Sequence, residues 1–134
     1  MSLTSPEIDH LLALAAEAAA NAYVPYSHFA VGAALRAKDG TIYTGCNVEN
    51  ASYGLTICAE RNAVARAVAG GARRFDAIAV VTENGVTPCG ACRQVLAEFG
   101  PAMTVIVADE AGRRRVYTIG DLLPDAFTPD QLDR

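Results

Sequence analysis

Two apolar runs constrain the fold more than any other feature of this chain. Residues 77–81 and 103–108 are almost continuously apolar, and each run has the length of one strand. Runs of this kind are typical of strands that are buried on both faces of a sheet. A predicted helix separates the two runs, as expected where a helical crossover joins two strands. The runs therefore predict an α/β fold.

The other elements follow from capping residues, alternation and turns. Ser5 and Pro6 predict the start of a first helix, and Lys38-Asp39-Gly40 predicts a hairpin turn. The expected elements, in order, are a helix over 5–21, strands over 29–37 and 41–48, a helix over 58–69, a strand over 75–82, a helix over 89–99, and strands over 103–108 and 114–119. We therefore expect a three-layer α/β/α sandwich on a mixed sheet.

Length and composition indicate one domain that gains from association. The chain has 134 residues, of which 51% are hydrophobic. This length fits a single domain, residues 1–134, which buries roughly two-thirds of the surface that its unfolded chain exposes. Many of the hydrophobic residues are alanines, which bury little area each. We therefore expect the domain to gain stability from contacts between subunits.

Charge and hydropathy argue against several classes of partner. The net charge is −4, and Arg113-Arg114-Arg115 is the one basic run, so we expect no nucleic-acid partner. The uncharged stretch 18–35 contains Asn, Pro, His and Gly, so we expect no membrane span and no targeting segment. A cytoplasmic location follows as the default. In that reducing compartment, the four cysteines are more often metal ligands or reactive thiols than disulfides.

Three of these cysteines lie at two expected helix starts. One start reads Cys-Ala-Glu-Arg from Cys58, and the other reads Pro-Cys-Gly-Ala-Cys from Pro88 to Cys92. A helix N-terminus carries partial positive charge, which favours thiolate over thiol. Cys89 and Cys92 are one helical turn apart, so both sulfur atoms can reach one ion. If the two helices lie side by side, Cys58 supplies a third sulfur.

Three ligands and one open position describe a catalytic zinc site, with water as the fourth ligand. Glu60 is close enough to Cys58 to contact that water without binding the metal. Zinc lowers the pKa of such a water to about 7, and a carboxylate can then accept and return the proton. This pattern predicts a nucleophilic water with Glu60 as its general acid and base.

Three other interpretations of the cysteines stay open on the spacing alone. A closed structural site would use all four cysteines, including Cys46. A thiol redox motif would explain Pro-Cys-Gly-Ala-Cys, but it would leave Cys58 and Glu60 without a role. Cysteines that serve only as small buried hydrophobes are common, but rarely occur as a pair at a helix start.

The two motifs resemble the signature of zinc nucleoside deaminases in its three-cysteine form. The similarity to small cytidine deaminases extends over nearly the whole chain. It includes three further segments: Tyr-Val-Pro-Tyr-Ser-His-Phe-Ala-Val-Gly-Ala-Ala (23–34), Asn-Val-Glu-Asn-Ala-Ser-Tyr-Gly (47–54) and Leu-Leu-Pro-Asp-Ala-Phe (122–127). The resemblance implies one zinc ion per subunit, held by Cys58, Cys89 and Cys92. It also implies hydrolytic deamination of cytidine and 2′-deoxycytidine to uridine and 2′-deoxyuridine plus ammonia, in pyrimidine salvage.

The resemblance also implies roles for residues around the metal. Hydroxide attacks C4 of the pyrimidine, while Glu60 protonates N3 and then the amino group. The backbone N–H of Ala59 binds the O2 carbonyl, and Phe29 packs near the base. Asn47 and Glu49 bind the ribose 3′-hydroxyl. On pattern alone, Phe29 would be a core residue, and the Asn47–Glu49 segment an ordinary polar loop.

Two further implications concern assembly and charge. Tyr53 and Phe127 match residues that the family supplies to a neighbouring subunit, which implies a homotetramer with shared active sites. Arg61 matches an arginine that hydrogen-bonds the thiolates. Three thiolates exceed the charge of zinc by one, and Glu60 adds another negative charge, so a nearby cation keeps the metal electrophilic. On pattern alone, Arg61 would be a solvated helix residue.

Three related functions remain as alternatives. Deaminases of aminonucleoside antibiotics share the zinc motifs, but Asn-Val-Glu-Asn from Asn47 favours a plain nucleoside. Deaminases of polynucleotides usually have histidine as the first ligand and a basic channel, and this chain has neither. A structural zinc protein that serves only as an interaction module would need no Glu60.

Overall fold

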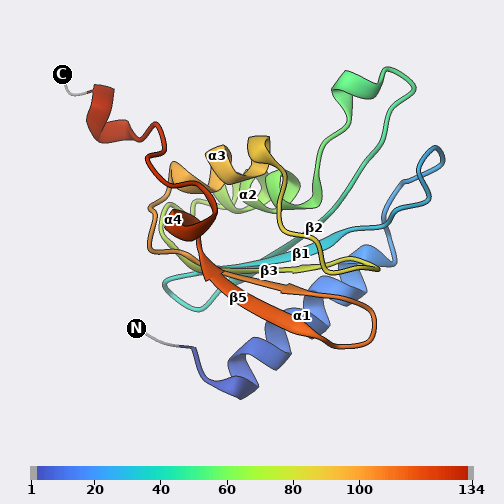
Figure 1. Ribbon diagram of the computed structural model, residues 1–134, viewed down its shortest axis with the longest axis horizontal. Coiled ribbons are helices and arrows are strands. Elements are labelled where there is room, and N and C mark those ends of the chain that lie inside the picture. The colour runs from blue at the N-terminus through green and yellow to red at the C-terminus, as the bar shows by residue number, and fades with distance from the viewer. Residues whose placement is uncertain (1–2, 133–134) are drawn as a thin grey trace.

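The computed structural model describes residues 3–132 and contains a five-stranded sheet with the order β2-β1-β3-β4-β5 (Figure 1). The expected domain also includes residues 1–2 and 133–134, which lie outside the described range. β3 and β4 run parallel, and the other neighbouring strands run antiparallel. The strands are β1 (Gly32–Ala37), β2 (Ile42–Cys46), β3 (Phe75–Val81), β4 (Thr104–Ala108) and β5 (Arg114–Thr118). The mixed sheet expected from the sequence is confirmed.

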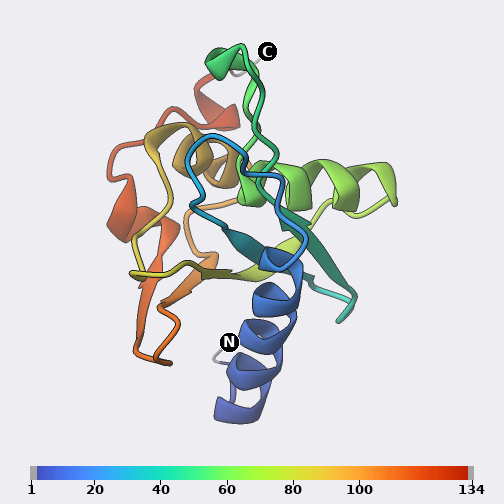
Figure 2. The same ribbon diagram turned by 90° about the vertical axis from the view of Figure 1, so that its right-hand side faces the viewer.

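Helices cover both faces of this sheet. α1 lies against one face, and α2 and α3 lie side by side against the other (Figures 1 and 2). The helices are α1 (Ser5–Ala19), α2 (Ala59–Ala69), α3 (Gly90–Ala97) and α4 (Ile119–Leu122), with 3-10 turns η1 (Tyr53–Leu55) and η2 (Pro129–Leu132). None of the helices within residues 3–132 is long and apolar enough to cross a membrane. The expected three-layer α/β/α sandwich is confirmed.

The central strands are buried on both faces, as their continuous apolar runs predict. Because successive side chains of a strand point to opposite faces, Leu35 and Ile78 pack beneath α2 and α3, while Ala34 and Ala79 pack against α1. Each buried leucine or isoleucine contributes about 1.5–3 kcal/mol of transfer free energy. The alanines contribute less, but they let α1 approach the sheet closely.

Two strand glycines bring the helix backbones into direct contact with the sheet. A Cβ atom on Gly32 would lie 1.8 Å from the carbonyl oxygen of Ala15 in α1. A Cβ atom on Gly45 would lie 2.5 Å from the carbonyl oxygen of Ala59 and 2.6 Å from the amide nitrogen of Ala63. Backbone contact at Gly45 therefore sets where the first turn of α2 lies on the sheet.

The N-cap of α1 differs from the expected one by one residue. Thr4, rather than Ser5, caps the helix, and it forms a capping box with Glu7. Ser5 is the first helical residue, and the helix ends at Ala19 rather than at residue 21. The capping box decides the start, because Glu7 lies at the third helical position only when Thr4 is the cap.

The first strand begins at Gly32 rather than at residue 29, because a side chain replaces part of the strand pairing. The side-chain amide of Asn47 donates to the carbonyl oxygen of Phe29 (2.8 Å) and accepts from the amide of Val31 (2.9 Å). Residues 29–31 therefore bond mainly to the Asn47 side chain, and the one backbone bond there runs from the Asn47 amide to the carbonyl oxygen of Val31 (3.2 Å). The hairpin partner is shorter as well, spanning Ile42–Cys46 instead of residues 41–48.

Candidate metal centre and its cavity

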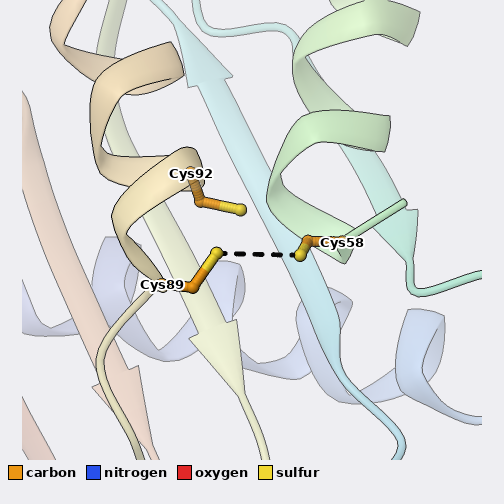
Figure 3. Close-up of side chains that lie close together, drawn as sticks. All are labelled: Cys58, Cys89 and Cys92. Carbon is orange, nitrogen blue, oxygen red and sulfur yellow. Dashed lines mark hydrogen bonds between the residues drawn. The ribbon is translucent and has the colours of Figure 1, made fainter. Parts of the chain in front are cut away.

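Three cysteine sulfur atoms meet where α2 and α3 begin (Figure 3). Cys58 is the N-cap of α2, Cys89 is the N-cap of α3, and Cys92 lies in the first turn of α3. The three sulfur atoms lie within 4.8 Å of one another, and those of Cys58 and Cys89 are 3.9 Å apart. The sequence argument depended on the condition that the two helix starts lie side by side; they do, and the three predicted ligands lie together.

This donor set fits a zinc ion that keeps one open position. Zinc accepts three thiolates at about 2.3 Å each and leaves a fourth tetrahedral position free. Cys89 is exposed and lies on a cavity, so a fourth ligand can reach the cluster. Among residues 3–132, no other group of His, Cys, Asp or Glu has metal-ligand spacing. Cys46 lies outside the cluster at the end of β2, so the four-cysteine site receives no support.

Electrostatics at the cluster favour a thiolate at Cys58. A hydrogen bond from the Cys92 thiol is the largest cause that lowers the pKa of Cys58 to about 5, and the Arg61 guanidinium lowers it further. Donation of that same hydrogen bond and burial raise the pKa of Cys92. One cysteine is therefore already ionised at neutral pH, and a metal ion would displace the remaining thiol protons as it binds.

Glu60 is a buried carboxyl beside this cluster. Its exposed fraction is 5%, and burial is the main cause that raises its pKa from 4.5 to about 7. The negative charge of Cys58 raises this pKa as well. A carboxyl with a pKa near 7 can both accept and donate a proton at neutral pH.

Arg61 faces the thiolates rather than solvent. Its Nη2 atom lies 3.5 Å from the Cys58 sulfur and 3.4 Å from the carbonyl oxygen of Thr56. Its Nε atom is buried and has no hydrogen-bond partner within residues 3–132. The guanidinium is therefore held beside the excess negative charge of the cluster.

A cavity of about 270 Å³ opens onto Cys58, Cys89 and Glu60. Its walls come from the segment before β1, the end of β2, the start of α2 and the loop before α3, and its lining residues are Phe29, Val31, Asn47, Thr56, Cys58, Ala59, Glu60, Val80, Thr82, Val86, Thr87 and Cys89. Larger hollows lie elsewhere within residues 3–132, and two of them, of about 520 and 640 Å³, are lined by no cysteine. Chemistry rather than size therefore identifies the candidate site.

A second cavity of about 290 Å³ adjoins the first, because Thr56 lines both. Glu49 lies here, where its carboxylate accepts hydrogen bonds from the amides of Tyr26 (3.0 Å) and Ser27 (3.2 Å) and from the Ser27 hydroxyl. The Ser27 hydroxyl bond is the largest cause that lowers the pKa of Glu49. Tyr53 completes this cavity. We refer to these two adjoining cavities together as the cleft, and to the first one, which Cys58 and Cys89 line, as its metal end.

Not every predicted site residue lies in this cleft. Phe29, Asn47, Ala59 and Glu60 line the metal end, and Glu49 and Tyr53 line the other end, although Tyr53 is 74% exposed. Three predicted residues line neither cavity: Cys92 is buried in the cluster, Arg61 lies beside the Cys58 sulfur, and Phe127 is 56% exposed on the C-terminal segment.

Sequence reasoning missed three residues that shape the site. Ser27 holds Glu49, and buried Thr82 accepts from the amides of Gly85 (2.8 Å) and Val86 in the cavity wall. Arg93 contacts the loop before Cys89. Only Arg93 had a sequence signal, because the Arg-Gln pair that it begins directly follows the second cysteine of the Cys-Gly-Ala-Cys motif.

Comparison with known proteins agrees with this geometry. The profile of the cytidine and deoxycytidylate deaminase zinc-binding region matches residues 6–108. The cytidine deaminase of Sporosarcina psychrophila is 51% identical over 129 residues, covering 94% of this chain and 95% of that protein. That of Halalkalibacterium halodurans is 52% identical over 126 residues, covering 92% and 96%. The crystal structure of cytidine deaminase from Burkholderia pseudomallei has a TM-score of 0.87 at 52% identity, covering 93% of this chain and 100% of that chain.

Proposed function

The chain belongs to the cytidine and deoxycytidylate deaminase zinc-binding family, and on that premise we propose that it is a zinc-dependent hydrolase of free pyrimidine nucleosides. Its substrates are cytidine and 2′-deoxycytidine, and its products are uridine or 2′-deoxyuridine and ammonia. The unit that acts is a single domain over residues 1–134. One observation carries the proposal: two cysteines of the three-cysteine cluster, Cys58 and Cys89, line the same cavity as a buried carboxyl with a pKa near 7.

Cys58, Cys89 and Cys92 would hold the zinc ion. When bound, zinc acts as a Lewis acid that makes a water molecule nucleophilic near neutral pH. Glu60 accepts one proton from the attacking water and delivers it to N3 of the base. It then takes the second proton of that water and delivers it to the amino group, which leaves as ammonia. The oxygen stays on C4, so the atoms balance.

The metal end of the cleft suits a planar base. Ala59 begins α2, so its backbone N–H has no acceptor within the helix and can donate to the O2 carbonyl. Phe29 and Val31 supply apolar wall, and Arg61 offsets the charge of the thiolates. These residues bind and orient the base, while Glu60 moves the protons.

The other end of the cleft suits the sugar. Asn47 lines the metal end and Glu49 lines the other end, and we propose that both bind the ribose 3′-hydroxyl. Both already bond to the segment over residues 26–31, so they also hold that segment. An amide or a carboxylate has further hydrogen-bonding capacity, which leaves room for the sugar.

We propose a homotetramer with shared sites. Tyr53 and Phe127 are both largely exposed, and Figure 1 shows η1 and the C-terminal segment extending from opposite ends of the molecule. One chain therefore does not bring both rings to one cavity. A neighbouring chain would provide the missing contact and cover both rings.

A cytoplasmic location and a role in pyrimidine salvage complete the proposal. The cysteines must stay reduced to bind zinc, and a reducing compartment provides that condition. Deamination of a free nucleoside recovers a uracil nucleoside for reuse.

The test is steady-state deamination of both nucleosides by purified protein, followed by the loss of cytidine absorbance, with zinc measured on the same sample. Glu60→Gln should keep zinc and fold but lose nearly all turnover, because an amide cannot accept the proton of water. Glu98→Gln, at the exposed C-cap of α3, is the matched control and should keep full activity. Activity of Glu60→Gln within tenfold of wild type would contradict its role. Zinc-loaded wild type without turnover would favour the structural zinc module.

A further inference from the structure

Arg93 bridges two segments that lie far apart in the sequence. Its Nε atom donates to the carbonyl oxygen of Pro88 and its Nη2 atom to the hydroxyl of Thr87, both at 2.7 Å. Its Nη1 atom donates to the carbonyl oxygen of Leu122, also at 2.7 Å. The first two contacts fix the loop that leads into Cys89. The third fixes the end of α4, where the C-terminal segment begins.

The next residue makes a second attachment to the same C-terminal segment. Gln94 donates from Nε2 to the carbonyl oxygen of Phe127 at 2.7 Å. Leu122, Leu123 and Ala126 pack against the core, whereas the Phe127 side chain is exposed. Figure 1 shows the chain leaving the body of the molecule beyond this point. The position of Phe127 thus depends on the first two turns of α3, the helix whose start carries two of the three cysteines.

We propose that Arg93 is a positioning residue that ties the metal loop to the C-terminal segment. Its guanidinium holds the Thr87–Pro88 loop, and with it Cys89, at a fixed position relative to Leu122 and the segment that ends in Phe127. Retention of zinc in one subunit and contact of Phe127 with substrate in the neighbouring subunit then depend on the same side chain. The claim about Phe127 and the neighbouring subunit rests on the proposed shared-site function, whereas the claim about zinc retention does not.

The chemistry of arginine suits this task better than that of lysine. Arginine presents its N–H donors in a rigid planar fork, so three acceptors in two distant segments become fixed relative to one another. A lysine in the same place keeps the charge, but it cannot reproduce this fixed three-way geometry. The contribution of Arg93 is therefore geometric, because its acceptors are two carbonyl oxygens and a hydroxyl rather than a counter-charge.

The test compares Arg93→Ala with Arg73→Ala in zinc-loaded protein. Arg73 is a matched control, because it donates to two backbone carbonyls, those of Val68 and Ala72, at the far end of α2. Two measurements do not depend on turnover: the rate of zinc transfer to a chelator, and hydrogen exchange of the amides over residues 122–127. Arg93→Ala should release zinc about tenfold faster and exchange these amides faster. Arg73→Ala should change neither.

Kinetics provide the link to Phe127. Arg93→Ala should raise KM for cytidine more than it lowers kcat, and Phe127→Ala should raise KM alone. If both act through the same ring, the double variant should have nearly the KM of the more impaired single variant rather than the product of the two effects. Arg73→Ala combined with Phe127→Ala should show only the Phe127 effect.

The outcomes separate the two halves of the inference. Unchanged zinc release and unchanged exchange in Arg93→Ala would overturn the inference outright, whatever the activity. Multiplicative KM effects of Arg93→Ala and Phe127→Ala would overturn the link to the neighbouring site. Wild type that binds zinc but does not deaminate would remove the proposed function and leave the first two measurements valid. Should Arg93→Ala not fold, the same measurements are made on Arg93→Lys and Gln94→Ala. Gln94→Ala is expected to alter hydrogen exchange but not zinc release.

Discussion

The sulfur atoms of Cys58 and Cys89 lie 3.9 Å apart, although 31 positions separate the two residues in the chain. Each is the N-cap of a helix, and both helices lie on the same face of the sheet. The positive ends of two helix dipoles therefore converge on one point, where they favour thiolates. The three-cysteine cluster therefore forms where α2 and α3 begin, and its preference for thiolates follows from that position.

Removal of any one of the three ligands should release the metal. Cys58→Ala, Cys89→Ala and Cys92→Ala should each lower zinc content and Tm, because the binding free energy of the metal is coupled to folding. Zinc analysis and thermal melts on the same samples measure both effects. Cys46→Ser is the control and should change neither. Loss of metal from Cys46→Ser would rule out a three-cysteine site.

Arg61→Ala should keep the fold but weaken activity. Without the guanidinium, the excess negative charge at the cluster is not offset, so the nucleophilic water becomes less acidic. The acidic limb of the kcat/KM profile should then move to higher pH by about one unit. Arg66→Ala, five residues further along α2 and exposed, should leave the profile unchanged. An unshifted profile in Arg61→Ala would make Arg61 a structural residue only.

In the metal-free protein, Glu60 should reduce stability as the pH rises. Its pKa is about 7 in the folded state and 4.5 as a model value, so the unfolded chain releases the proton first. The unfolding free energy of wild type, relative to that of Glu60→Gln, should therefore fall from pH 4.5 upward and level off above pH 7. The full change is about 3 kcal/mol at most. Urea unfolding of chelator-treated samples across this range measures it, and a pH-independent difference would mean that Glu60 titrates normally.

Phe127→Ala should raise KM for cytidine without loss of zinc. The ring is exposed in the single chain and, in the proposed tetramer, contacts the base bound by a neighbour. Leu132→Ala changes an exposed apolar side chain on the same segment and is the control. Light scattering at micromolar concentration tests the assembly, which truncation before Leu122 should loosen. A fully active monomer would mean that each site is complete within one chain.

Patterns with a strong local cause were predictable from the sequence. The apolar runs fixed the buried strands, and the two cysteine motifs gave the helix starts that carry the cluster. Boundaries were less predictable where side chains take over backbone roles. Asn47 replaces strand pairing at residues 29–31, and Thr4 with Glu7 moves the first cap by one residue. Neither effect has a periodic signal.

Contacts between distant segments were not predictable at all. Nothing near Arg93 in the sequence indicates that its guanidinium reaches Leu122, because the meeting depends on how α4 packs beside α3. The same holds for the bond of Ser27 to Glu49, which joins two loops. Phe127 was identified by resemblance alone, since an aromatic residue in a terminal segment has no local pattern that assigns it a role.

The glycine at position 45 has a consequence for how such a sequence can change over time. Where side chains meet, a substitution can be absorbed by a neighbouring rotamer, but the contact of Gly45 with α2 is made by main-chain atoms that have no alternative arrangement. A single added methyl group there would displace the helix and carry Cys58 with it. Substitution at position 45 in the edge strand β2 is therefore limited by the position that the Cys58 sulfur must keep at the start of α2. An alanine at position 45 would disturb the metal site without contacting the metal.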